Sequence, residues 1–235
     1  MNGNSGVYGR LRQLPVAVLS DVLSAMGLPD QILASSIRPF GVSTVIAGPA
    51  LCLAGRDGPE ASARAGASKP VFEMDRHVSD GCIVVIAGGA DCIGATIGGN
   101  VALSWKLRGC KAVVIDGGVR DLAEFGEFAL PVFATFATPK STKGLWSFSA
   151  VNVPIALPGQ TGAQVDIVPG DAIHGDADGV IVIPAAHVEQ AVRNAEIFES
   201  MEKSIQRDLR SGEDREAVYK RYDKLGHIKP VKATH

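Results

Sequence analysis

The sequence lacks the features that mark several large classes of protein. No apolar run approaches the roughly 18 residues that a membrane-spanning helix needs, and the opening MNGNSGVYGRLRQ has no apolar signal core. Basic residues are not in excess, because 23 Lys and Arg stand against 25 Asp and Glu and the formal net charge is -2. We therefore expect a soluble, cytoplasmic protein whose partners are neither nucleic acid nor membrane.

Paired cysteines and zinc-ligand spacings are also missing. Cys52, Cys82, Cys92 and Cys110 form no CxxC pair, and most of them lie in apolar stretches. A free thiol in such a stretch behaves as a small hydrophobic side chain. These cysteines are therefore predicted to be reduced core residues, and a zinc site based on histidine is not expected.

The chain is long enough for one well-buried core. It has 235 residues, of which 46% are hydrophobic, which is short for two full domains. The expected organisation is an N-terminal extension at residues 1–18, an α/β domain at residues 19–184 and a helical arm at residues 185–235. An arm that projects in this way is more often an oligomer contact than a free element.

The middle of the chain alternates between strand and helix patterns. Residues 82–87 (CIVVIA) are almost entirely apolar, which is typical of a strand covered on both faces. Further strands are predicted at residues 111–116 and 132–136, with helices at residues 100–108 and 122–128. The alternation implies right-handed crossovers and a largely parallel sheet.

The two flanks of this segment have a different texture. Ser20 and Asp21 predict a capped helix that ends at Gly27. Interruptions at Gly41 and at Gly48 and Pro49 predict two short strands around a turn or bulge. The C-terminal flank predicts short strands followed by two helices, at residues 151–156, 164–168, 172–174, 180–183, 185–210 and 213–222.

Two loops are expected to meet at the carboxyl edge of the sheet, where ligands collect in open α/β folds. Gly98, Gly99 and Asn100 open a helix, so free amides and the helix dipole would attract an anion. Arg120 offers a fork of donors for a carboxylate, and Asp121 beside it can hold a hard divalent cation. The alternatives are a surface arginine, an aspartate that caps a helix, and glycines needed only for close packing.

Three other aspartates form an apparent cluster in PGDAIHGDADG. Asp171, Asp176 and Asp178 stand beside glycines, where aspartate commonly stabilises a turn through its own backbone. We therefore interpret them as turn residues and not as a metal cluster. His174 lies among them without a second histidine at a ligand spacing.

Several ordered motifs resemble those of one family. VIDGGVRD, LPVFA, VNVPIALPGQ and GDADGVIVIP, with SDVL and AGPAL nearer the start, are similar to the family of the regulator of ribonuclease activity A and the 4-hydroxy-4-methyl-2-oxoglutarate aldolases. The likeness runs from about residue 19 to about residue 212. It implies a swivelling β/β/α domain assembled as trimers or dimers of trimers, with sites between subunits.

The aldolase members imply a lyase that uses Mg²⁺ or Mn²⁺ and releases pyruvate from a 2-oxo acid by retro-aldol cleavage or decarboxylation. Carried over by motif, Asp121 would be the metal ligand and Arg120 would hold the substrate. The loop residues Gly98, Gly99, Asn100 and Val101 would bind the pyruvyl carboxylate.

One position departs from the aldolase pattern. The aldolases carry an acidic residue about twenty positions before the Arg-Asp pair, and this chain has Gly99 there. Asp91 could supply the missing carboxylate from another direction, and Glu199 or Glu202 could reach a neighbouring subunit. The alternative function is a non-catalytic regulator that binds proteins, as the ribonuclease E inhibitors do.

Overall fold

A computed structural model describes residues 6–41, 45–58 and 70–231 of the chain. The helices are α1 (Val7–Leu11), α2 (Val16–Ala25), α3 (Pro70–Asp75), α4 (Gly99–Leu107), α5 (Leu122–Glu127), the 3-10 helix η1 (Ala185–His187), α6 (Val188–Arg210) and α7 (Arg215–Arg221). The strands are β1 (Arg38–Phe40), β2 (Ile46–Asp57), β3 (Ile83–Ala87), β4 (Ala95–Ile97), β5 (Ala112–Ile115), β6 (Gly118–Val119), β7 (Val132–Ala134), β8 (Phe136–Ala137), β9 (Trp146–Val151), β10 (Ile155–Pro158), β11 (Gln164–Ile167), β12 (Ala172–Asp176) and β13 (Gly179–Ile183).

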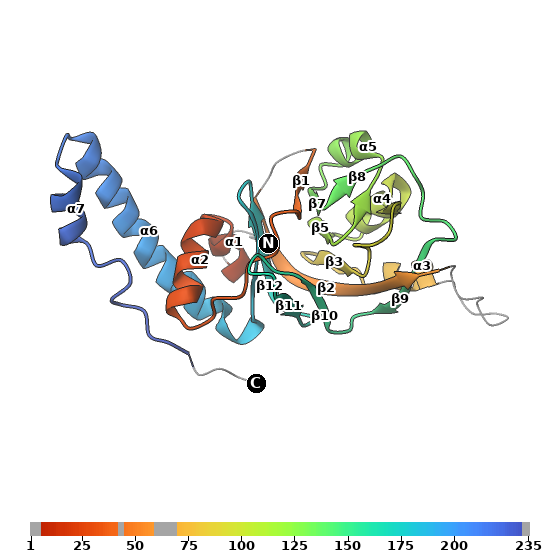
Figure 1. The fold of residues 1–235 in the computed structure, drawn as a ribbon, viewed down its shortest axis with the longest axis horizontal. Coiled ribbons are helices and arrows are strands. Elements are labelled where there is room, and N and C mark those ends of the chain that lie inside the picture. The colour runs from red at the N-terminus through yellow and green to blue at the C-terminus, as the bar shows by residue number, and fades with distance from the viewer. Residues whose placement is uncertain (1–5, 42–44, 59–69, 232–235) are drawn as a thin grey trace.

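The main sheet is parallel at its centre and antiparallel at its edges. Its order is β1-β7-β5-β3-β2-β12-β13, and β9 also pairs with β2. The pairs β3·β5 and β5·β7 are parallel, as the strand and helix alternation predicted, and β2·β3 is parallel as well. The sheet and its helices surround a buried core (Figure 1), which confirms the predicted α/β class.

Strand β2 is the longest strand and connects the parts of the sheet. It pairs with β12 at its start, with β3 in its middle and with β9 at its end. The predicted interruption at Gly41 is confirmed, because β1 ends at Phe40 and Gly41 has φ 75°. The interruption predicted at Gly48 and Pro49 is wrong, because both residues lie inside β2 and Pro49 pairs opposite Ala172. The glycine serves close packing: a Cβ on Gly48 would lie 2.3 Å from the carbonyl oxygen of Gly81.

A second sheet of three short parallel strands lies at the carboxyl edge of the first. Its order is β4-β6-β8, and its strands follow β3, β5 and β7 along the chain. The sequence did not predict it: residues 118–119 were assigned to a turn, and residues 132–136 to one strand where the structure has β7 and β8. Strands of two or three residues are too short to produce a visible apolar period.

Side chains from the two faces of the main sheet enter separate clusters. In β3, Val84 and Ile86 pack with Trp105 on one face, whereas Ile83 and Val85 pack with Leu157 from β10 on the other. Every residue of β3 is buried, so the prediction of a strand covered on both faces is confirmed. All four cysteines are free and buried, as the sequence indicated.

The N-terminal helices and the first half of α6 form a third cluster. Helix α2 begins after Pro15 and Ser20 and Asp21 lie inside it, so the predicted cap is wrong. The apolar spacing of Val18, Leu19 and Val22 places the helix start earlier, while Gly27, with φ 85°, ends the segment as expected.

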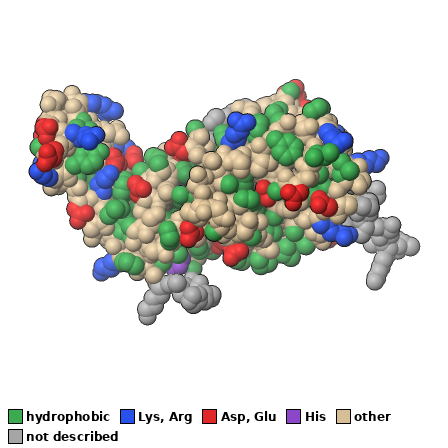
Figure 2. Space-filling view, in the orientation of Figure 1, with side chains coloured by type: hydrophobic (Ala, Val, Ile, Leu, Met, Phe, Trp, Pro, Cys, Tyr) green, Lys and Arg blue, Asp and Glu red, His purple; other side chains and the backbone are tan. Residues whose placement is uncertain are grey.

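The long helix α6 forms the predicted arm. It packs on α1 and α2 near its start, and its far end carries α7 away from the sheets (Figure 1). The space-filling view shows a notch between the tip of this arm and the body (Figure 2). The predicted pairs Glu189–Arg193 and Glu199–Lys203 are present, with nitrogen to oxygen distances of 3.3 and 3.5 Å.

In the C-terminal half, three of the four predicted strands are present as β11, β12 and β13. The strand predicted at residues 151–156 is wrong, because Asn152 has φ 55° and separates β9 from β10. Within the described ranges, no helix is both long and apolar enough to cross a membrane.

The packing of α6 on α2 should contribute substantially to stability. Phe198 is 2% exposed in this cluster, whereas its neighbour Ile197 is 44% exposed. Phe198→Ala should lower the free energy of unfolding by about 3–5 kcal/mol, and Ile197→Ala by less than about 1 kcal/mol. Urea unfolding of both variants measures the difference. Equal losses would contradict the packing described for α6.

Candidate functional site

The candidate site lies where the three short parallel strands end. Strand β4 leads into Gly98, β6 into Arg120 and β8 into Thr138. Because β4, β6 and β8 are parallel neighbours, these three residues leave the sheet at the same edge. The topology therefore brings together the two segments that the sequence predicted, at Gly98 and Arg120. It adds a third segment, at Thr138, that the sequence did not predict.

Arg120 and Asp121 both lie against the start of α4. A Cβ on Gly98 would be 2.5 Å from Asp121 Oδ2 and 2.9 Å from Arg120 Nε, so only glycine leaves room for both. The Gly99 amide donates a hydrogen bond of 3.0 Å to Asp121 Oδ2, and Arg120 Nε lies 3.5 Å from the same oxygen. The cationic side chain, the carboxylate and the helix start thus converge.

The first turn of α4 retains donors for an anion. Its amides at Gly99, Asn100 and Val101 precede the first internal helix bond, and the Gly99 amide is taken by Asp121. Within the described ranges, the amides of Asn100 and Val101 have no acceptor. Free amides at a helix start favour a bound carboxylate or phosphate.

Asp121 is held in an unusual backbone conformation and remains open to solvent. Its φ of 61° and ψ of 38° are left-handed, which aspartate tolerates better than most residues. The side chains of Arg120 and Asp121 are 39% and 37% exposed. They line a cavity of about 350 Å³ together with residues from the ends of β6 and β8: Val119, Leu122, Ala137, Thr138 and Pro139.

Helix α4 is fixed to the body by its buried face. Trp105 is fully buried, and its indole nitrogen donates a 2.9 Å hydrogen bond to Asp75 at the end of α3. The hydroxyl of Ser104 donates to the other oxygen of the same carboxylate, at 2.7 Å. These contacts fix the direction in which the free amides of α4 point.

The donor chemistry at this edge fits a hard divalent cation. Magnesium keeps several water ligands and commonly takes only one or two protein carboxylates together with substrate oxygens. Asp121 offers such a carboxylate, half open to the cavity. Within the described part of the chain, no group of three or more His, Cys, Asp or Glu side chains could enclose a metal, so a closed all-protein cage is not the kind of site that fits.

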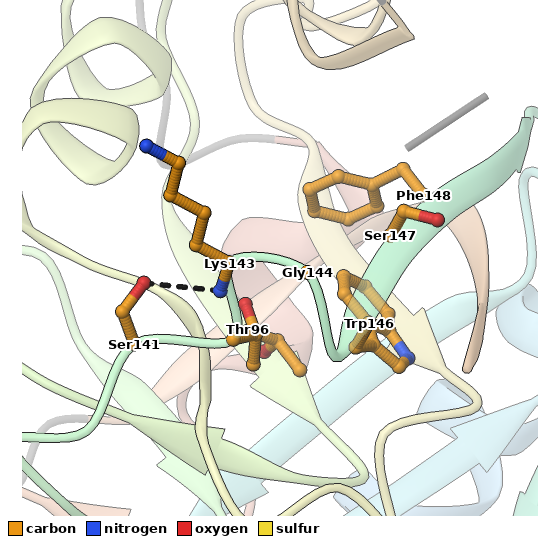
Figure 3. A pocket seen from close by; sticks show the side chains of 8 residues that line it. Thr96, Ser141, Lys143, Gly144, Trp146, Ser147 and Phe148 are labelled. Atoms are coloured by element: carbon orange, nitrogen blue, oxygen red, sulfur yellow. Dashed lines mark hydrogen bonds between the residues drawn. The ribbon is translucent and has the colours of Figure 1, made fainter. Parts of the chain in front are cut away.

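A second cavity of about 250 Å³ lies along the same loop, beyond Pro139 (Figure 3). The rings of Trp146 and Phe148 lie on one side, and Thr96, Ser141 and Lys143 on the other. This cavity has a single cationic side chain and no carboxylate among its lining residues. It therefore lacks the pairing of acid and base that the cavity at Arg120 has.

The aspartates near the C-terminal strands are turn residues, as predicted. Asp171 accepts hydrogen bonds from the amides of Val168 and Ala185, and Asp176 accepts from those of Val16 and Asp178.

His174 lies among these aspartates but is fully buried, so it is not available to a ligand. Its two ring nitrogens each lie 2.8 Å from a backbone carbonyl oxygen, of Ile46 and Leu14. Burial lowers the pKa of His174.

The other candidate carboxylates have neighbours outside the cavity at Arg120 and Asp121. Glu199 pairs with Lys203 and Glu202 with Lys224, on α6, at the opposite end of the molecule from α4 and α5 (Figure 1). Burial raises the pKa of the Asp116 carboxyl, and the charge of nearby Asp91 raises it further. A contribution from Glu199 or Glu202 of a second copy stays a prediction.

Comparison with known sequences identifies relatives over most of the chain. The pattern of the RraA-like family, described as Aldolase/RraA, matches residues 16–182. A protein of Halalkalibacterium halodurans, provisionally named 4-hydroxy-4-methyl-2-oxoglutarate aldolase, is 30% identical over 200 residues, or 85% of this chain and 87% of the relative. A Thermus thermophilus protein named 4-hydroxy-4-methyl-2-oxoglutarate aldolase is 34% identical over 109 residues, or 44% of this chain and 60% of the relative.

Comparison with solved structures supports the same fold. Streptomyces coelicolor RraAS2, described as an unusual member of the RNase ES inhibitor RraA protein family, superposes with a TM-score of 0.72. The match has 21% identity and covers 88% of this chain and 97% of RraAS2. The predicted swivelling β/β/α domain with a helical arm is confirmed at this level.

Two glycines, Gly98 at the site and Gly126 in α5, allow a matched test of the packing at the site. Gly98→Ala should lower the free energy of unfolding by about 1–3 kcal/mol, because the methyl group would overlap Asp121 and Arg120. Gly126→Ala, in α5 where nothing lies within 4 Å, should raise it by about 0.5–1 kcal/mol. Urea unfolding of both variants gives the comparison, and a stabilised Gly98→Ala protein would contradict the geometry.

Asp116 should make stability depend on pH. Burial, and then the charge of Asp91, raise its pKa above the usual value of 3.8. The folded state therefore retains this proton to higher pH than the unfolded state, and folding loses stability as pH rises from that usual value through the raised one. Asp116→Asn should be more stable than the parent at pH 7, with the gain shrinking toward pH 3 in thermal unfolding. A gain that grows toward pH 3 would contradict this.

Proposed function

The chain belongs to the RraA-like (Aldolase/RraA) family, and from that premise we propose that it is a divalent-metal-dependent lyase. Its substrate would be a small 2-oxo acid of the 4-hydroxy-4-methyl-2-oxoglutarate type, and its product pyruvate. The reaction would be retro-aldol cleavage or decarboxylation. The observation that carries the proposal is the convergence of Arg120, Asp121 and the free amides of Asn100 and Val101 on one edge.

The protein would recognise the substrate with hydrogen-bond donors for its carboxylate and carbonyl oxygens, and with a carboxylate that holds the cation. A 2-oxo acid presents a carboxylate beside a carbonyl oxygen, so it needs hydrogen-bond donors at both places. The amides of Asn100 and Val101 would donate to the carboxylate, and the Arg120 guanidinium to the carbonyl oxygen or to a carboxylate. Asp121 would keep its oxygen toward a cation because the Gly99 amide fixes the carboxylate from behind.

The same groups would lower the barrier to carbon–carbon cleavage. As the bond breaks, its electron pair moves onto the carbon next to the 2-oxo group, and negative charge builds on the carbonyl oxygen. A divalent cation, when bound, would supply Lewis-acid polarisation of that oxygen. Arg120 would stabilise the same developing charge from a fixed position, which costs little reorganisation during the reaction.

The bound carboxylate would remain held at the start of α4 while the rest of the substrate leaves. Cleavage of a 4-hydroxy-4-methyl-2-oxo diacid gives two molecules of pyruvate, once the proton of the 4-hydroxyl group has left and the carbon next to the 2-oxo group has taken up a proton. Loss of carbon dioxide from oxaloacetate gives one pyruvate after the corresponding carbon takes up a proton from solvent. Both reactions place the same charge on the same oxygen, so one arrangement of residues suits both. This shared step is the reason for testing both substrates.

We propose that the protein also assembles with copies of itself through the arm. The tip formed by the end of α6 and by α7 stands away from the body, which leaves it free to meet a neighbour (Figure 1). A trimer or hexamer would bring a second copy's Glu199 or Glu202 within reach of a site only if the arm of one copy lies near α4 of another. Light scattering on the purified chain tests the assembly.

The activity test measures pyruvate release with a coupled dehydrogenase. In the presence of Mg²⁺ or Mn²⁺, the protein should release pyruvate from 4-hydroxy-4-methyl-2-oxoglutarate or oxaloacetate, and chelation should stop it. Asp121→Asn and Arg120→Ala should each lower kcat/KM by about 10²–10³, since each removes a group aimed at the developing charge or its cation. Arg193→Ala, an exposed arginine of α6 that pairs with Glu189, is the matched control and should retain activity.

Equal rates for the parent and Asp121→Asn on every acid would end the lyase proposal. In that case the alternative of a non-catalytic, protein-binding regulator would gain support from specific binding of a ribonuclease by the same inactive protein. No contact in the described residues favours that alternative in advance.

A further inference from the structure

The carboxylate of Glu124 occupies the space where a side chain of residue 99 would lie. Glu124 is in the first turn of α5, three positions after Asp121. A Cβ on Gly99 would be 1.7 Å from Glu124 Oε2 and 2.5 Å from its carboxyl carbon. The two positions therefore cannot both be filled: a side chain at residue 99 excludes Glu124 from this place, and glycine admits it.

Glu124 and Asp121 lie over adjacent residues of the same helix start. Asp121 Oδ2 lies 2.5 Å from the place of a Cβ on Gly98, and Glu124 Oε2 lies 1.7 Å from the place of a Cβ on Gly99. Asp121 accepts a hydrogen bond from the Gly99 amide, whereas the carboxylate of Glu124 accepts none from any residue of the described ranges. Two carboxylates so placed repel one another, and a shared cation would remove the repulsion.

The helix start alone does not account for this arrangement. The dipole of α4 and the free amides of Asn100 and Val101 favour negative charge at its first turn, but within the described ranges Glu124 accepts a hydrogen bond from neither amide. Glu124 is exposed and could turn into solvent, away from Asp121. Its position over Gly99, next to the residue that Asp121 contacts, is one in which a bound cation would offset the charge of both carboxylates.

We propose that Glu124 is the second carboxylate of the cation site, supplied from α5 in place of the side chain that residue 99 lacks. The inference rests on the proposed function, because it concerns the same site. Asp121 and Glu124 would face the cation from one side, and water and substrate oxygens would complete its coordination. The acidic group at this site would thus come from residue 124 instead of residue 99, while its place beside Asp121 would be kept.

The test measures Mn²⁺ binding to the full-length protein without substrate, by the loss of the free-ion electron paramagnetic resonance signal. Glu124→Gln should weaken Mn²⁺ binding about 10- to 100-fold. Gly99→Ala should weaken it similarly although every carboxylate remains, because the methyl group displaces Glu124. Glu127→Gln, the other exposed acid of α5, is the matched control and should bind as the parent does.

A relocation variant separates charge from position. Gly99→Asp combined with Glu124→Ala returns the carboxylate to residue 99 and should restore Mn²⁺ affinity to within a few-fold of the parent. Unfolding curves of each variant verify that the fold is intact. Gly99→Ala should remain folded, since the atom it meets is the end of a flexible, exposed side chain.

The outcomes distinguish this inference from the function on which it rests. Unchanged Mn²⁺ affinity in both Glu124→Gln and Gly99→Ala, with affinity lost in Asp121→Asn, would overturn the role of Glu124 and leave the lyase intact. Absence of Mn²⁺ binding and of pyruvate release in the parent protein would overturn the proposed function itself. Weakened binding in Glu124→Gln and Gly99→Ala, with recovery in the relocation variant, supports the inference.

Discussion

The hydrogen bond from the Gly99 amide to Asp121 Oδ2 joins the two halves of the site. It links the start of α4 to the residue that follows β6, although the two lie 22 positions apart in the chain. Asp121 adopts a left-handed backbone conformation at this contact, which costs on the order of 1–3 kcal/mol. Without this hydrogen bond, the positions of the Asp121 carboxylate, the Arg120 side chain and the amides of α4 would not be fixed relative to one another.

This bond depends on packing far from the cavity. Helix α4 can present its amides to Asp121 only because buried Trp105 and the carboxylate of Asp75 fix the helix on the sheet. The parallel register of β4, β6 and β8 in turn sets Gly98 and Arg120 side by side. Glycine at residue 98 is the condition for their close approach, since any larger residue would occupy the space of Arg120 and Asp121.

Much of this arrangement could be predicted from the sequence. The apolar run of β3 and the alternation of strand and helix indicated a parallel sheet, and the rule that ligands collect at carboxyl ends then selected Gly98, Arg120 and Asp121. The short strands β6 and β8 could not be predicted, because two residues carry no period. Thr138 was missed for the same reason, since only the pairing of β8 with β6 brings it to the cavity.

The relation between Gly99 and Glu124 is of a kind that sequence patterns do not contain. The sequence alone indicates that an acidic residue is missing at position 99 and that Glu124 is an exposed residue of a short helix. Only the distance between a missing Cβ and a carboxylate oxygen shows that the two belong to one place. Similarly, the cap predicted at Ser20 and Asp21 failed because the packing of α2 set the helix start at Val16, where no side chain caps it.

The carboxyl edge of the sheet β4-β6-β8 is proposed to bind a cation and an oxo acid together. The most direct measurement is the anomalous scattering of Mn²⁺ in crystals soaked with pyruvate. The account predicts one strong peak at about 2.0–2.3 Å from a carboxylate oxygen of Asp121, with pyruvate density between that peak and the amides of Asn100 and Val101. A peak beside Asp91 and Asp116, or pyruvate bound away from α4, would contradict it.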